Sequence, residues 1–334
     1  MSSRLFMQTV TAVLSAGLVF AADNAVATLS GPRLGLVFDP AAGDLRPIGG
    51  IPGAATTGEP LSLGFIIASA AVSPTGDAAL VVEASSSVAL VQAAGGDWVA
   101  ALLDGVQPAP DRMVFSPSGA AAALHYATGR VQILTGLPGA ASVAGEIDAS
   151  SLPAPVTAMA VDDAGSFLLM AAGQAEPVSL YLLPLGTAPS LVTTFRSVSA
   201  LQLFNSGRQA LVTDTLASTV YQITDPAGAA ALQAIASQSD GIEGLVAAQS
   251  DASGQRVFAA TAAGTVFIFD RSGSPATTLD CACAPAGLFP LTGAATFRLT
   301  ELAGGPLQVL DASGAPRIVS VPPPTRAERS RKPQ

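Results

Sequence analysis

The residue types that carry most enzyme chemistry are scarce in this chain of 334 residues. It contains one histidine, His125, and two cysteines, Cys281 and Cys283. A Ser–His–acid triad needs histidine as its general base, so His125 is the only candidate for that role. No Gly-x-Ser-x-Gly sequence, dinucleotide-binding glycine motif or phosphate-binding Gly-Lys-Ser/Thr loop accompanies it. We therefore interpret His125 as a strand-end or loop residue, and we predict no catalytic residue.

Metal and cofactor sites are also poorly supported. A structural zinc site normally takes four Cys or His ligands, and the chain has three such residues in total. EF-hand calcium loops are absent, and the pair Asp162-Asp163 has the composition of a turn, which Asp commonly stabilises. The sequence therefore predicts no metal and no cofactor.

Cys281-Ala282-Cys283 is the one unusual local element. In a straight strand, the Cα atoms of residues i and i+2 lie about 6.6 Å apart. This is near the upper limit of the Cα separation in a disulfide, so a bridge needs a local kink. Ala284-Pro285 directly afterwards provides one. We predict an intrachain disulfide, with a pair of reduced, partly buried thiols as the alternative. Redox catalysis is disfavoured, because no helix start is present to stabilise a thiolate.

A turn that ends in glycine recurs along the chain. The glycines stand at 76, 119, 165, 207, 254 and 293, in steps of 43, 46, 42, 47 and 39 residues. Ser-Pro-x-Gly occurs at the first two turns and Asp-x-x-Gly at two later ones. Glycine supplies the positive φ that tight turns need, and Pro, Ser and Asp favour turn initiation. Short apolar segments precede and follow each turn, as expected for buried strands.

A second hairpin recurs further along each unit. Its first strand is expected at 34–39, 87–92, 130–135, 178–183, 219–224, 265–270 and 306–311. Four short strands every 39–47 residues are typical of a propeller blade. The sequence therefore predicts an all-β chain with one seven-bladed β-propeller. The alternative is six blades plus an N-terminal hairpin.

The first blade is expected to be short. Only residues 22–32 lie between the export signal and its first hairpin, which leaves room for one strand, near 25–29. We predict fewer strands in this blade than in the others, contact between the first and last blades, and almost no helix.

The turn motifs of Ser73–Val82 and Ser116–Leu124 resemble those of exported bacterial β-propellers of the broad YVTN, lactonase-like and WD40-like group. The resemblance covers about residues 30–321 and implies the propeller architecture. The Gly-His and Trp-Asp dipeptides of true WD40 repeats are missing, since Trp98 is followed by Val99. No motif of the group matches a catalytic residue here, so the resemblance implies nothing about chemistry.

The two ends differ in composition from the body. Residues 1–22 resemble a signal peptide, with Arg4 followed by an uncharged, mostly apolar run to Phe20. That run is shorter than a membrane span, so cleavage is favoured over an N-terminal anchor. We place the propeller at 23–321 and a disordered, Pro-rich basic tail at 322–334, with no membrane span after cleavage. Export to the periplasm or the extracellular space follows.

The net charge of −9 and the pI of about 4.5 argue against nucleic-acid binding. Propeller ligands usually sit over the channel, on the face that carries the loops between blades. The charged residues expected there give a mostly acidic face: a solvated rim or a binding mouth for a cationic or hydroxyl-rich ligand. Between blades they are Glu59, Asp111, Arg112, Asp148, Arg196, Asp240 and Glu243, and within blades Glu83, His125, Glu176, Asp214 and Glu301.

These observations favour a non-catalytic binding or scaffold module that takes a protein, peptide or glycan ligand in the cell envelope. The alternative is an enzyme, either a lactonase-like hydrolase or a metal-assisted lyase. Its site would use carboxylates and Arg112 or Arg196 over the channel.

Overall fold

A computed structural model describes residues 31–94, 97–271, 276–303 and 305–323. The predicted signal peptide, the strand expected near 25–29 and most of the basic tail lie outside these residues. The described part is all-β, with a single three-residue 3-10 helix, Gln238–Asp240. No helix in these ranges is long and apolar enough to cross a membrane.

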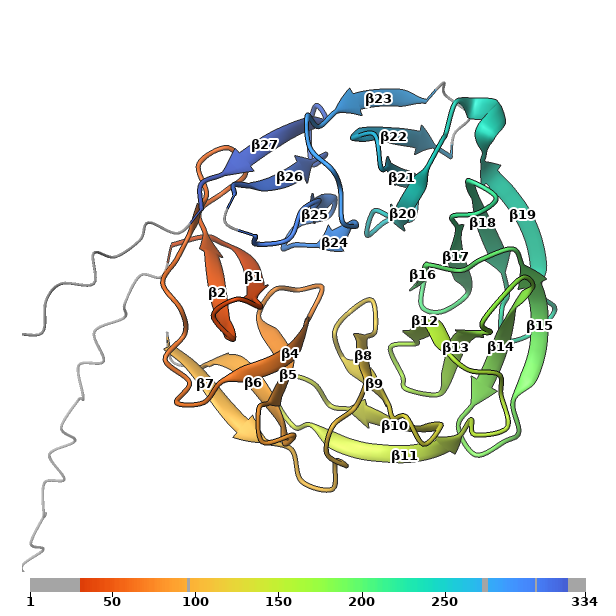
Figure 1. The fold of residues 1–334 in the computed structure, drawn as a ribbon, viewed down its shortest axis with the longest axis horizontal. Helices are drawn as coiled ribbons and strands as arrows, with labels where there is room; N and C mark the ends of the chain where they lie inside the picture. Colours follow the sequence, from red (N-terminus) through yellow and green to blue (C-terminus); the bar gives the residue numbers. More distant parts are fainter. Residues whose placement is uncertain (1–30, 95–96, 272–275, 304, 324–334) are drawn as a thin grey trace, which may run out of the picture. The chain divides into compact units, whose positions relative to one another are not determined.

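Seven antiparallel sheets form a ring of blades, as Figure 1 shows. The first blade has three strands and the other six have four. The seven-bladed prediction is confirmed, and the alternative of six blades plus a hairpin is wrong.

The strands of each blade follow one another in the chain. Blades one to three comprise β1 (Arg33–Asp39), β2 (Asp44–Gly49), β3 (Thr56–Thr57); β4 (Ile67–Val72), β5 (Ala78–Glu83), β6 (Val88–Ala94), β7 (Asp97–Leu102); and β8 (Arg112–Phe115), β9 (Ala121–His125), β10 (Arg130–Thr135), β11 (Ser142–Asp148). Blades four and five comprise β12 (Val156–Val161), β13 (Phe167–Ala172), β14 (Val178–Pro184), β15 (Ser190–Phe195); and β16 (Ala200–Phe204), β17 (Gln209–Asp214), β18 (Thr219–Thr224), β19 (Ala231–Ala236). Blades six and seven comprise β20 (Leu245–Ser250), β21 (Arg256–Thr261), β22 (Thr265–Asp270), β23 (Thr277–Asp280); and β24 (Phe289–Pro290), β25 (Thr296–Arg298), β26 (Leu307–Asp311), β27 (Arg317–Val321).

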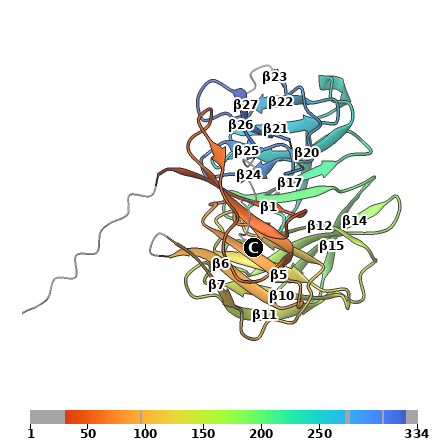
Figure 2. The same ribbon diagram turned by 60° about the vertical axis from the view of Figure 1, so that its left-hand side comes forward.

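Strand direction defines two faces of the ring. Because neighbouring strands are antiparallel, the segments that join blades lie on the same face as the middle turn of each four-stranded blade. We call this the connection face. The first and third turns of those blades, including the glycine turns, lie on the opposite face. Figure 2 shows the stacked blades from the side.

The core lies between neighbouring blades. The second strands β5, β9 and β17 are buried along nearly their whole length, which explains why they are continuous apolar runs. Between the fourth and fifth blades, for example, Leu180 packs in one cluster with Val212. Full burial of a Leu or Val side chain contributes about 1.5–3 kcal/mol to folding.

The recurring turns close each first hairpin and also join blades. Asp162 is buried, and its Oδ1 accepts the N–H groups of Ser166 at 2.7 Å and Phe167 at 2.9 Å. Gly119 has φ +78°, and a Cβ there would lie 2.5 Å from Ser73 Oγ of the preceding blade. The motif therefore encodes a turn conformation and a close approach between blades.

Among residues 31–323 of the described chain, the first blade has no counterpart of the innermost strand of the other blades. Its β1–β2 turn lies on the connection face, because Gly43 O accepts from Ile67 N at 2.8 Å, at the start of β4. Residues of the last blade fill the gap: Thr292 N donates to Leu34 O at 2.7 Å, and Thr292 Oγ1 donates to Thr75 O at 2.8 Å. The predicted contact between the first and last blades is confirmed. The described part of the first blade has three strands, with Thr56–Thr57 as the third, and the strand expected near 25–29 lies outside the described residues.

Candidate functional site

The charged residues expected on the connection face do not form one site over the channel. Three of them, Glu176, Arg196 and Asp214, line a groove between the fourth and fifth blades. Glu59 lines a second groove between the first and second blades. The others lie at the channel mouth or in local turns.

The groove between the fourth and fifth blades, groove 4/5, has a volume of about 520 Å³. Strands β15, β17, β18 and β19 and the turns at their ends supply its walls. Its lining residues are Glu176, Pro177, Thr194, Phe195, Arg196, Asp214, Ala217, Tyr221 and Leu232.

Groove 4/5 has an apolar and aromatic side. The rings of Phe195 and Tyr221 lie 5.2 Å apart at 52°, a tilted arrangement that favours aromatic contact. Leu232 on β19 is 46% exposed, although an apolar side chain of this size usually packs in a core. These side chains offer a ligand apolar area to bury.

Asp214 shapes groove 4/5 without being free to bind a ligand. It is 1% exposed. Its carboxylate accepts hydrogen bonds from Arg196 N at 2.9 Å, Ser197 N at 3.1 Å, Ser197 Oγ at 2.9 Å and Ala217 N at 3.0 Å. It therefore ties the connection after β15 to the turn after β17 and holds Arg196 in place.

Arg196 supplies the exposed charge of groove 4/5. Its Nη2 lies 3.0 Å from Glu176 Oε1, and the two side chains are 61% and 45% exposed. Its Nη1 donates to Leu216 O at 3.4 Å. An exposed ion pair of this kind contributes only about 0–1 kcal/mol, so a carboxylate brought by a ligand competes readily with Glu176.

His125 lies at the mouth of the channel beside Asp111 and Arg112. Its Nδ1 is 2.6 Å from Asp111 Oδ1, and Arg112 Nη2 donates to Val156 O of the next blade at 3.1 Å. Within the described ranges, no hydroxyl or thiol is hydrogen-bonded to His125, and no group of three or more His, Cys, Asp or Glu side chains is placed to hold a metal ion.

Several of the expected residues act within their own loops. Hydrogen bonds from Ser150 lower the pKa of Asp148, and Glu83 accepts from Ser85 Oγ at 2.9 Å. Asp240 accepts from Ser237 N at 2.9 Å in a capping box. Glu301 pairs with Arg298 at 2.7 Å, and Glu243 is exposed near the 3-10 helix.

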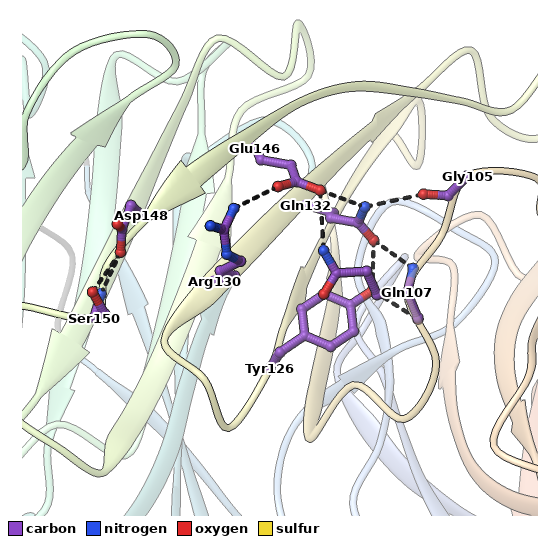
Figure 3. Close-up of polar contacts among 8 residues, drawn as sticks. All are labelled: Gly105, Gln107, Tyr126, Arg130, Gln132, Glu146, Asp148 and Ser150. Atoms are coloured by element: carbon purple, nitrogen blue, oxygen red, sulfur yellow. Dashed lines mark hydrogen bonds and ion pairs between the residues drawn. The ribbon is translucent and has the colours of Figure 1, made fainter.

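A buried polar network, which sequence reasoning missed, joins the second and third blades (Figure 3). Gln132 Oε1 accepts from Gln107 N at 2.9 Å and from the Tyr126 hydroxyl at 2.7 Å. Its Nε2 donates to Gly105 O at 3.1 Å and to Glu146 Oε1 at 2.9 Å. All four hydrogen-bonding positions of the amide are occupied, so the network fixes the connection between the blades and leaves nothing for a ligand.

Burial dominates the electrostatics of this network. It raises the pKa of Tyr126 to about 12, and the nearby Glu146 charge acts in the same direction. The phenol is therefore protonated at neutral pH, and its single proton is shared between Gln132 Oε1 at 2.7 Å and Gln107 O at 3.0 Å. The signal in the sequence was one amide, Gln132, between the apolar residues Val131 and Ile133 of β10.

Cys281 and Cys283 form a disulfide in the structure, with Cα atoms 5.0 Å apart. They lie between β23 and β24, at the junction of the sixth and seventh blades. Ala282 between them has φ +49°. This positive φ provides the local bend that a straight strand lacks.

Comparisons with known proteins bear on the fold. No family profile matches the chain, and no curated protein matches it. A crystal structure of a functionally unknown protein from Desulfotomaculum acetoxidans DSM 771 aligns with a TM-score of 0.61 at 13% identity, over 87% of this chain and 100% of that one. The β-propeller domain of Myceliophteria thermophila Cps50 (Swd1) aligns with a TM-score of 0.50 at 14% identity, over 84% of this chain and 97% of that one. At these identities the likeness shows a shared β-propeller fold.

Proposed function

We propose that the protein is a non-catalytic binding module that holds a peptide segment of a protein partner in groove 4/5. The observation that carries the proposal is the combination of an apolar, aromatic wall with the exposed guanidinium of Arg196. Ligand sites generally combine apolar area with a few polar groups that fix orientation.

The lining residues indicate the chemistry of the ligand. The Phe195–Tyr221 pair and Leu232 favour an apolar side chain, and Arg196 favours a carboxylate nearby. A peptide with an acidic residue next to a large apolar one supplies both groups. A glycan has less apolar surface to bury against this wall, so we favour a peptide ligand over a glycan.

Selection from a displayed random peptide library tests the proposal. Peptides selected on the intact chain are synthesised and their affinity is measured by calorimetry. We expect Leu232→Asp and Arg196→Ala each to weaken binding about tenfold, the loss of one hot-spot contact. Leu102→Asp is the matched control, because Leu102 is an exposed leucine, 63%, on the outer strand β7 of the second blade. Selected peptides that bind all four proteins equally contradict the proposal.

We also propose that the protein is exported and works in the periplasm or outside the cell. The signal-like sequence of residues 1–22 and the Cys281–Cys283 bridge support this location, since disulfides persist in oxidising compartments. Kinship with exported YVTN and lactonase-like propellers is part of the same proposal and rests on the Ser-Pro-x-Gly turns. Mass spectrometry of the protein from the envelope and medium tests it. An N-terminus between Ala22 and Thr28 is expected, and an intact N-terminus in the cytoplasm contradicts it.

A further inference from the structure

A second groove on the connection face is not used by the proposed function. Groove 1/2 has a volume of about 610 Å³ and follows the connection from β3 to β4. Leu61 and Phe65 are half-buried in it, and Ile66 is 65% exposed. Asp44 and Glu59 also line it. The groove therefore combines apolar surface with negative charge.

The basic group beside groove 1/2 does not cancel this charge. Arg46 Nη1 donates to Gly58 O at 3.4 Å, at the edge of the groove. Its Nε, however, lies 2.9 Å from Asp39 Oδ2, and both of these side chains are largely buried. Arg46 is thus paired with Asp39, and Asp44 and Glu59 remain to attract a cation.

The end of the described chain lies next to this groove. Strands β3 and β27 are the last strands of neighbouring blades and both run toward the connection face. Thr57 Oγ1 donates to Pro322 O at 3.1 Å, so the two chain segments are side by side (Figures 1 and 2). Glu59 follows Thr57 by two residues. The segment after Pro323 therefore starts near the acidic end of groove 1/2.

That segment has the opposite charge to the groove. Residues 324–334 contain Arg326, Arg329, Arg331 and Lys332 and one acid, Glu328, in a chain whose net charge is −9. Eleven extended residues reach up to about 36 Å at about 3.3 Å each. The groove wall spans residues 59–66, so the segment is long enough to follow it.

We propose that residues 324–334 bind groove 1/2 of their own chain, with basic side chains against Asp44 and Glu59. Each exposed ion pair is weak. Attachment at Pro323 makes the contact intramolecular, and a short tether gives an effective concentration in the millimolar range. The tail is then a built-in ligand that occupies groove 1/2, and any other cationic peptide must displace it.

The test compares the full chain with a chain that ends at Pro323. The probe is a fluorescent synthetic peptide of residues 324–334, followed by anisotropy. We expect the peptide to bind the shortened chain, to bind the full chain at least about tenfold more weakly because its groove is occupied, and to be released by salt. Asp44→Asn and Glu59→Gln in the shortened chain should each weaken binding about two- to fivefold. Glu243→Gln, an exposed acid elsewhere on the connection face, is the control and should change nothing.

Hydrogen exchange gives a second readout that needs no added peptide. Backbone amides of residues 59–66 should exchange more slowly in the full chain than in the shortened one, with groove 4/5 unchanged. Equal exchange in the two chains, or equal peptide affinity for them, overturns the proposal and leaves the groove open to an external partner. A full chain that dimerises through its tail as concentration rises also overturns it, because the occupant is then a second copy.

Discussion

Asp214 holds four hydrogen bonds on one carboxylate, and the shape of groove 4/5 depends on them. Three of the donors are backbone N–H groups in two different segments. Removal of a buried acceptor destabilises the fold, because each N–H or O–H group that it accepted from stays buried without a hydrogen-bond partner and is not fully solvated. Arg196, which binds the groove's ligand in our proposal, is held through its own N–H by this carboxylate.

We predict that Asp214→Ala lowers the free energy of unfolding by about 2 kcal/mol, because several buried donors lose their acceptor. Asp214→Asn should lose about half as much, since one acceptor oxygen remains. Urea unfolding measures both. Asp148→Ala, at an exposed turn, is the control and should stay within about 0.5 kcal/mol. Equal losses for Asp214→Ala and Asp148→Ala contradict the role assigned to Asp214.

The second prediction concerns Cys281 and Cys283. Thiol titration of the unfolded, unreduced protein from an oxidising compartment should find no free thiol. Cys283→Ser should lower the melting temperature by less than about 2 °C, because the loop closed by the bridge is very short and loop-closure entropy grows with loop length. Two free thiols refute the bridge. A large fall in melting temperature would show that the disulfide stabilises the fold by more than the loop-closure entropy.

At the scale of elements, the glycine turns of the opposite face hold the blades in register. Their first residue is an acceptor for the N–H groups of the turn in most copies: Ser116 Oγ accepts from Ala121 N at 3.1 Å, and Asp251 Oδ1 accepts from Gln255 N at 2.9 Å. Asp251 also pairs with Arg256 at 3.1 Å. In one of these turns the fold stabilises the charged form of an ionisable group, the carboxylate of Asp251.

The carboxyl group of Asp251 makes the free energy of unfolding depend on pH. Burial alone raises the pKa of its carboxyl, but hydrogen bonds from Ser253, Arg256 and the N–H of Gln255 outweigh burial and hold the pKa below its usual 3.8. A depressed pKa stabilises the fold fully above 3.8, and this contribution is lost as the pH falls through the folded-state value. We predict that Asp251→Asn flattens the loss of stability between about pH 5 and pH 3, measured by urea unfolding. Parallel curves for the two proteins contradict this.

The elements also show what the sequence was able to predict. Glycines that recur every 39–47 residues predicted the blades, because a position with a positive φ and a close contact to a neighbouring blade favours glycine, as at Gly119. Groove 4/5 was only partly predicted: its charged residues stood in the expected loops, but Tyr221 and Leu232 look like ordinary strand residues. Their meeting depends on the packing of two blades, which no local pattern records. The two-residue strand Thr56–Thr57 was missed because two residues carry no alternation.

At the scale of the whole molecule, the ring closes at a seam beside the first blade, which has three strands in the part of the chain that the structure describes. The seam is made by the last blade, the first blade and the glycine turn of the second. Apolar contacts accompany its hydrogen bonds, with Leu34 and Ile48 of the first blade in one cluster with Leu291 and Leu307 of the last. Side chains and turns, rather than a shared ladder of strands, therefore join the two ends of the described chain.

Gly76 is the position where this seam is most sensitive. A Cβ there would lie 2.6 Å from Thr292 Oγ1 and 2.8 Å from Gly35 Cα, and φ is +72°. We predict that Gly76→Ala costs about 3 kcal/mol, from the strained φ and from overpacking. Gly105→Ala is the control, since φ is +75° but the nearest atom is 3.8 Å away, and it should cost about 1 kcal/mol. Equal melting temperatures for the two variants contradict a tight seam.

The three described strands of the first blade also determine which face of the ring carries each end of the described chain. Strand β1 begins on the opposite face at Arg33, whereas β27 ends on the connection face at Val321. A support attached ahead of Gly31 is thus joined to the face away from both grooves, and it leaves them pointing outward. A support attached through the C-terminal tail holds the molecule by the groove side and crowds groove 1/2. Immobilisation for binding studies should therefore use the N-terminal end.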